Sequence, residues 1–130
     1  MAIKVLTIDD DPGMTALIKL FLLKGDMFDV QVANTGIAGL DAARNWEPDV
    51  IVLDLMMPNI SGWEVCKEIR TFSQVPILIL SVVSESDQLT AALDYGANDY
   101  LGKPITKNEL ISHIIKLTNN ISIDFPSNTD

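Results

Sequence analysis

Five short apolar runs, each followed by a segment with helical spacing, constrain the fold of this chain more than any other feature of its sequence. The runs are rich in β-branched residues, as strands are, and they cover 3–8, 28–33, 50–53, 77–80 and 99–101. The first, third and fourth runs are apolar without strict alternation, which is expected where helices cover both faces of a parallel sheet. This pattern excludes a simple antiparallel sandwich.

The segments between the runs carry start and stop signals of helices. Pro12 suits the first turn of a helix that Gly25 is placed to end. Thr35 is a candidate N-cap of a second helix, which Glu47 and Pro48 stop before the third run. Apolar spacing predicts three further helices, after 62, around 89–93 and over 110–117. Strict alternation of strands and helices predicts right-handed crossovers and a doubly wound, three-layer α/β fold.

Length, charge and composition limit the number of domains, the possible partners and the cellular location. A length of 130 residues suits one domain, expected over residues 1–120, and the polar, aperiodic segment 121–130 is expected to be a tail or the start of a linker. The 18 acidic and nine basic residues give a formal charge of −9, which disfavours contact with nucleic acid or an anionic membrane. The single cysteine, Cys66, and the lack of any run of about 18 apolar residues predict a cytoplasmic protein.

Candidate site residues follow the first, third, fourth and fifth runs, at the edge where parallel sheets carry their sites. They are Asp9, Asp10, Asp11, Asp54, Ser81 and Lys103. Crowded carboxylates repel one another unless they share a cation, and oxygen ligands favour a hard ion such as Mg²⁺, for which Mn²⁺ could substitute. A divalent ion beside a lysine and a hydroxyl makes a receptor for a phosphoryl group, which a carboxylate can accept as an aspartyl phosphate.

Taken singly, these residues also have ordinary interpretations. Asp11, directly before Pro12, is favoured as a helix N-cap. An isolated Ser81 or Lys103 would be a common polar residue at the end of a strand. Only their joint position at one sheet edge predicts a site.

An ordered set of motifs extends this interpretation. The chain carries Ile-Asp-Asp-Asp-Pro at 8–12, Val-Leu-Asp-Leu-Met-Met-Pro at 52–58, a glycine-containing turn at 59–62, Ser81, and Gly-Ala-Asn-Asp-Tyr-Leu-Gly-Lys-Pro at 96–104. From residue 3 to residue 119, the chain resembles the receiver domain of two-component response regulators, in the superfamily of chemotaxis regulators. The resemblance implies a flavodoxin-like (βα)5 sandwich whose parallel sheet has the strand order 2-1-3-4-5.

The resemblance also implies which residues hold the metal and the phosphoryl group. Asp54 is the expected phosphoacceptor and a metal ligand. Asp9 and Asp10 are the expected metal-binding acids, with Asp10 the more direct ligand. The backbone carbonyl of Met56 is expected to be a further ligand of Mg²⁺.

Further roles follow from the same resemblance. Ser81 and Lys103 are the expected catalytic residues that contact the phosphoryl oxygens. Ser81 and Tyr100 form the expected switch, in which the aromatic ring turns inward when the hydroxyl moves toward the phosphate. Tyr100 could equally be an ordinary strand aromatic. Pro104 is expected to follow a cis peptide bond.

Several positions depart from the residues usual in this family. Val82 stands where a small residue is usual, and Met56 and Val83 lack the polar groups that often flank the site. Because neither of these two can orient an attacking water, slow autodephosphorylation is expected. Asn98 and His113 differ from the DNA-binding, winged-helix class, so dimerisation through the charge-paired face of that class is not expected. A homodimer formed on phosphorylation through apolar surface of the fourth and fifth helices stays open.

These observations predict a signalling module rather than an enzyme, since the chain would catalyse only its own phosphorylation and slow dephosphorylation. A sensor histidine kinase or a phosphotransfer protein would donate the phosphoryl group to Asp54. The surface of the fourth helix, the last strand and the last helix would then control a downstream effector or partner by a population shift. No direct contact of this domain with nucleic acid is expected.

Three other functions stay open. A phosphohydrolase of the haloacid-dehalogenase type shares the acidic strand end, but needs an acidic pair downstream of Lys103, where only Glu109, Asp124 and Asp130 occur. A degenerate receiver would act as a constitutive binding surface, although all its key positions are filled here. Flavin binding would rest on analogy of fold alone.

Overall fold

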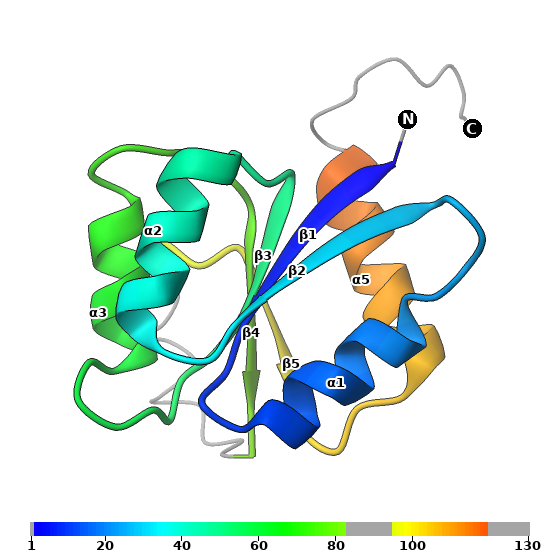
Figure 1. The fold of residues 1–130 in the computed structure, drawn as a ribbon, viewed down its shortest axis with the longest axis horizontal. Helices are drawn as coiled ribbons and strands as arrows, with labels where there is room; N and C mark the ends of the chain where they lie inside the picture. The colour runs from blue at the N-terminus through cyan, green and yellow to red at the C-terminus, as the bar shows by residue number, and fades with distance from the viewer. Residues whose placement is uncertain (1, 83–94, 120–130) are drawn as a thin grey trace.

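The chain forms an open parallel sheet with helices on both faces (Figure 1). The computed structural model describes residues 2–82 and 95–119. In chain order, the elements are β1 (Ile3–Ile8), α1 (Pro12–Phe21), β2 (Phe28–Ala33), α2 (Gly36–Trp46), β3 (Val50–Asp54), α3 (Gly62–Ile69), β4 (Ile77–Ser81), β5 (Asp99–Gly102) and α5 (Lys107–Asn119). The strands are all parallel and lie in the order β2-β1-β3-β4-β5. The predicted flavodoxin-like, doubly wound α/β fold is therefore confirmed.

Two apolar clusters, one on each face of the sheet, hold the helices in place. The cluster that contains Leu6, Ile8 and Ile79 packs against α2 and α3. The cluster that contains Val5 and Leu80 packs against α1 and α5, and Figure 1 shows the two helix pairs on opposite sides of the sheet. β3 and β4 are buried along their whole length, because helices cover both of their faces. This double cover explains why their sequences do not alternate.

Side-chain caps start the first two helices where the sequence predicts them. Asp11 caps α1, and its Oδ1 accepts the N–H of Gly13 at 2.9 Å. Thr35 caps α2, and its Oγ1 accepts the N–H of Ala38 at 3.0 Å. Both caps bind backbone donors that have no partner inside the helix.

The end of α1 corrects one sequence prediction. The helix ends at Phe21, and Leu22 rather than Gly25 is its C-cap. The N–H of Leu22 bonds to the Ile18 carbonyl at 3.0 Å, and the Leu22 side chain is 2% exposed, so packing against the sheet closes the last turn early. Gly25 lies in the turn toward β2, where its φ of +56° is a conformation that favours glycine.

Some predictions concern residues outside the described part of the chain. The fourth helix, expected around 89–93, is among them, as are Val83 and the segment 121–130. Within residues 2–82 and 95–119, no helix has both the length and the apolar character needed to cross a membrane.

Candidate functional site

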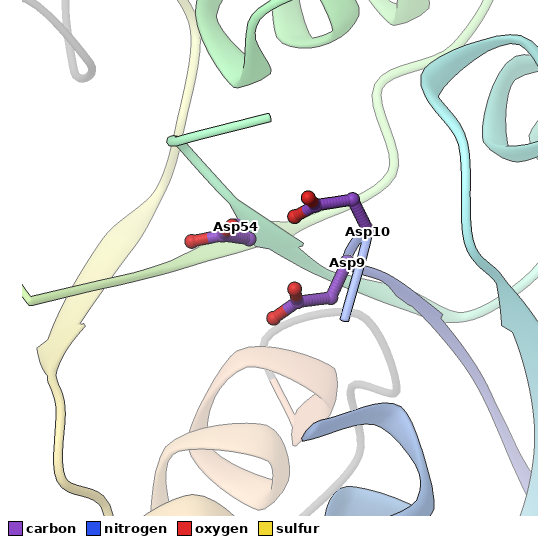
Figure 2. A group of neighbouring side chains, drawn as sticks. All are labelled: Asp9, Asp10 and Asp54. Carbon is purple, nitrogen blue, oxygen red and sulfur yellow. The ribbon is translucent and has the colours of Figure 1, made fainter. Parts of the chain in front are cut away.

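Three carboxylates meet at the carboxyl edge of the sheet (Figure 2). Asp9 and Asp10 follow β1, and Asp54 ends β3, which pairs with β1. One carboxylate oxygen from each residue lies within 4.8 Å of those from the other two. Asp9 and Asp54 are only 2% and 5% exposed, whereas Asp10 is open to solvent. The structure thus brings together the three acids that the sequence assigns to one site.

Lys103 is the cation that faces these acids. Its Nζ lies 3.3 Å from Asp9 Oδ2 and 3.4 Å from Asp54 Oδ1. The residue follows β5, its N–H donates to the Ser81 carbonyl at 2.8 Å, and its peptide bond to Pro104 is cis. One ammonium therefore spans two buried carboxylates, while a third carboxylate stands beside them.

The electrostatics of this group favour a further cation. Burial raises the pKa of the Asp54 carboxyl, and repulsion from Asp9 raises it further. Lys103 and a backbone hydrogen bond from Met56 lower this pKa without cancelling the rise. A bound cation would offset the excess negative charge, and the side-chain ligand atoms available to it are carboxylate oxygens. Such ligands fit a hard divalent ion, Mg²⁺ or Mn²⁺.

Asp11 has a structural task beside this cluster. Its carboxylate caps α1, as the ordinary interpretation of this residue predicts. Its N–H donates to Asp9 Oδ1 at 3.0 Å, which fixes one oxygen of the Asp9 carboxylate. Asp11 therefore contributes to the site through its backbone.

Ser81 and Tyr100, the expected switch residues, lie on β4 and β5. Ser81 ends β4 and is fully buried. Because Asp54 pairs with Leu80, Ser81 stands one residue beyond the level of the acceptor. Tyr100 packs against the cluster on the α2 and α3 face. A Cβ placed on Gly102 would lie 3.5 Å from the Tyr100 hydroxyl oxygen, so this hydroxyl lies toward the carboxyl edge.

The loop from β3 to α3 runs close to the acceptor. A Cβ placed on Gly62 would lie 2.5 Å from the Asp54 carbonyl oxygen, so the close approach of α3 to β3 requires glycine here. Ser61 and Glu64 form a capping box that fixes the start of α3. Met56 is 56% exposed in this loop. Its side chain is thus open to solvent, and the role of its carbonyl as a metal ligand stays a prediction.

Asn34 is a residue of this region that sequence reasoning missed. It follows β2, and its side-chain amide donates to the Asp9 carbonyl at 2.8 Å and to Thr15 Oγ1 at 3.1 Å. The signal that could have found it is its place in the sequence. It is the first polar residue after the second apolar run, as Asp9 is after the first.

Comparison with known proteins gives consistent results for the sequence. The family model described as the response regulator receiver domain matches residues 5–115. Response regulator ArlR of Staphylococcus epidermidis is 40% identical over 110 residues, which cover 85% of this chain and 50% of ArlR. DNA-binding response regulator MtrA of Mycolicibacterium smegmatis is 35% identical over 111 residues, which cover 85% of this chain and 48% of MtrA. The chain spans about half the length of these curated relatives.

Solved structures give the same result for the fold. The receiver domain of the Francisella response regulator 1452 superposes with a TM-score of 0.85 at 32% identity, covering 92% of this chain and 98% of that one. The response regulator domain of Thermotoga maritima CheB superposes with a TM-score of 0.84 at 30% identity, with the same coverage. The sequence match over residues 5–115 includes Asp9, Asp10, Asp54, Ser81 and Lys103.

Proposed function

The chain belongs to the family of response regulator receiver domains, and on this basis we propose that it accepts a phosphoryl group on Asp54 in two-component signalling. The donor is a sensor histidine kinase or a phosphotransfer protein of the cytoplasm. The observation that carries the proposal is the meeting of Asp54 with Asp9, Asp10 and Lys103 at one sheet edge. We assign residues 1–120 to the receiver domain and 121–130 to a tail or the start of a linker.

The chemistry needs a nucleophile, positive charge and a leaving group in line with the attack. An oxygen of the Asp54 carboxylate forms a bond to phosphorus while the bond from phosphorus to the imidazole nitrogen of the donor breaks. That nitrogen keeps the electron pair and leaves as neutral imidazole when the other ring nitrogen carries a proton. Lys103, whose Nζ lies 3.4 Å from Asp54 Oδ1, would neutralise charge on the phosphoryl oxygens, and the Ser81 hydroxyl would donate a hydrogen bond to one of them.

We assign Asp9, Asp10, Asp54 and the carbonyl of Met56 as the ligands of Mg²⁺, for which Mn²⁺ could substitute. When bound, the ion supplies positive charge that stabilises the phosphoryl oxygens during transfer. Support comes from the raised pKa of Asp54, because its burial and the charge of Asp9 outweigh the effect of Lys103.

An apolar cavity beside Lys103 suits contact with the phosphodonor. Its volume is about 360 Å³, and its lining includes Met14, Leu17, Pro104 and Ile105. Leu17 is 37% exposed on α1. A donor protein that brings its phosphohistidine to Asp54 would cover this apolar surface, whereas a small phosphodonor would not need it.

The output would change through β5, α5 and the fourth helix predicted between β4 and β5. Ser81 would move toward the phosphoryl group, and Tyr100 would turn inward. His113 Nδ1 on α5 lies 2.7 Å from Asp99 Oδ2 on β5, so a shift of one element would move the other. The surface of these elements is where an effector or partner would bind.

The effector would be an attached domain or a separate protein. The relative named as a DNA-binding response regulator, MtrA, is about twice as long as the matched region. With its charge of −9, this domain would not itself contact nucleic acid. A homodimer formed on phosphorylation is a further expectation, which sizing with and without beryllofluoride would test.

The chain would catalyse only its own phosphorylation and a slow loss of the phosphoryl group. Exposed Met56 has a thioether, which cannot orient a water for attack on phosphorus. Val83, the second residue of this expectation, lies outside the described residues.

The proposal is tested with acetyl phosphate as the donor. With Mg²⁺, wild-type protein should gain one acid-labile phosphoryl group by intact mass, and Asp54→Asn should gain none. Chelation of Mg²⁺ should stop the reaction of the wild type. Labelling of Asp54→Asn would move the acceptor to another residue. Turnover of a generic phosphate ester by the wild type would favour the phosphohydrolase alternative.

A further inference from the structure

The side-chain amide of Asn34, in the turn between β2 and α2, links the acidic loop to two other segments. Its Nδ2 donates to the Asp9 carbonyl at 2.8 Å and to Thr15 Oγ1 at 3.1 Å, so both of its hydrogens have acceptors. Thr15 is 2% exposed, and its own hydroxyl donates to the Pro12 carbonyl at 3.1 Å. The amide therefore joins the end of β2, the loop after β1 and the first turn of α1.

The Asp9 carbonyl belongs to the peptide that joins Asp9 to Asp10. This peptide is planar, so its orientation sets the direction in which both side chains leave the backbone. Asp9 has further contacts, since its N–H bonds to the Ala33 carbonyl at 3.1 Å and its Oδ2 faces Lys103 at 3.3 Å. Asp10 is exposed, so packing does not hold its side chain and its direction depends on the backbone.

Asn34 and Asp10 line the same small cavity. Its volume is about 70 Å³, and Asp10, Asn34 and Pro58 are among its lining residues. A cavity of about 10–15 Å³ is enough for one water molecule, so this cavity can hold water next to Asp10. Mg²⁺ in proteins keeps several of its waters. The wall formed by Asn34 therefore borders the space in which waters of a bound ion would lie.

We propose that Asn34 is a positioning residue of the metal site, whose amide holds the Asp9–Asp10 peptide so that both carboxylates face one divalent ion. The inference rests on the proposed function, because the ion is the Mg²⁺ of phosphoryl transfer. An amide suits this task because it supplies two donors and adds no charge beside three carboxylates. Aspartate at this position would offer no donor, and serine would be too short to reach the same two acceptors.

The test measures Mg²⁺ binding by isothermal titration calorimetry, with Mg²⁺ itself as the probe. Asn34→Leu keeps the branched shape and removes the amide, and it should raise the Kd for Mg²⁺ about tenfold, the size typical of lost outer-shell contacts. Asn45→Leu, at an exposed position near the end of α2, is the matched control, since it makes the same change away from the acidic loop. Its Kd should stay within about twofold of the wild-type value.

Kinetics with acetyl phosphate give a second measurement. Asn34→Leu should need about ten times more Mg²⁺ for half of its maximal rate, while its rate at saturating Mg²⁺ should stay within about threefold of wild type. A merely structural role would lower the melting temperature without moving the Mg²⁺ dependence. If Asn34→Leu folds poorly, Asn34→Gln keeps an amide, and it should bind Mg²⁺ more tightly than Asn34→Ala.

Two results would overturn the inference, and they differ in what else they affect. Wild-type protein that binds Mg²⁺ with a Kd shared by Asn34→Leu and Asn34→Ala contradicts the role of Asn34 alone. Wild-type protein that binds no Mg²⁺ contradicts the metal site itself, and the proposed function with it.

Discussion

The two edges of the sheet are both polar, but their polar groups are satisfied to different degrees. At the amino edge, the Arg70 guanidinium donates to the carbonyls of Gly96 and Ser73 and to Asn98 Oδ1, at distances of 2.8 to 3.1 Å. Asn98 Oδ1 also accepts the N–H of Ile77 at 2.9 Å. The acceptors of the Arg70 guanidinium are all neutral, and all of them belong to this domain.

The carboxyl edge has charges that the fold leaves in excess. Among the described residues, Lys103 is the one cation that faces Asp9 and Asp54, at the longer distances of 3.3 and 3.4 Å, and Asp10 adds a further negative charge nearby. Burial and repulsion raise the pKa of Asp54. The amino edge thus stabilises the fold, whereas the carboxyl edge suits groups from outside, which we propose are a metal ion and then a phosphoryl group.

The largest effect is expected at the cation of the carboxyl edge. Lys103→Ala should slow phosphorylation by acetyl phosphate about a hundredfold, because removal of one group that stabilises the transferring charge typically costs that much. Lys107→Ala, at an exposed position of α5, is the matched control and should change the rate less than about twofold. A Lys103→Ala rate close to that of the control would remove Lys103 from the reaction.

The amino edge should respond in stability and not in chemistry. Arg70→Ala should lower the free energy of unfolding by about 2 kcal/mol, because it removes hydrogen bonds from a charged donor to the partly buried carbonyls of Ser73 and Gly96. Exposed Lys67→Ala on α3 should lower it by less than about 0.5 kcal/mol. Urea denaturation measures both values. If folded Arg70→Ala lost as much phosphorylation rate as Lys103→Ala, the proposed difference between the two edges would be wrong.

A smaller effect is expected on the lifetime of the phosphoryl group. Met56→Gln introduces an amide that can orient water beside Asp54, so dephosphorylation should become about tenfold faster. Met27→Gln changes a methionine in the turn before β2 and should leave the rate unchanged. The decay of intact mass over time gives both rates. Unchanged decay in Met56→Gln would show that water orientation at this position does not limit dephosphorylation.

The smallest effect is expected in the pH dependence of the melting temperature when Mg²⁺ is absent. Since the pKa of Asp54 is raised in the folded state, its ionised form destabilises the fold at neutral pH, and this penalty vanishes as pH falls below the ordinary pKa of about 3.9. Asp54→Asn should therefore melt a few degrees higher than wild type at pH 7, with the difference shrinking toward pH 4. Thermal denaturation in chelator measures it. A lower melting point of Asp54→Asn at pH 7 would contradict excess negative charge at this edge.

The parts of the site that sequence could predict are those that its strand ends carry. Asp9, Asp54, Ser81 and Lys103 each follow an apolar run, and parallel strands bring such residues to one edge whatever the details of packing. The burial of both faces of β3 and β4 was predictable as well, because it makes their sequences apolar without alternation.

The parts that sequence could not predict depend on contacts between distant residues. The place of Asn34 after an apolar run is visible in the sequence, but its bond is not, because the acceptor is a backbone carbonyl 25 positions away. Asn98 stands out in the sequence only as a departure from its family, and the structure shows it bonded to Arg70, 28 positions earlier. The end of α1 was missed because buried Leu22 closes the helix before Gly25 is reached.

The most direct test of the central claim is to locate the phosphoryl group. Protein phosphorylated by acetyl phosphate in Mg²⁺ is digested and its peptides are sequenced by mass spectrometry. The phosphoryl group should lie on Asp54 alone, with none on the peptide that contains Asp9, Asp10 and Asp11. A phosphoryl group on any other residue, or one that forms on Asp54 equally well in chelator, would contradict the account.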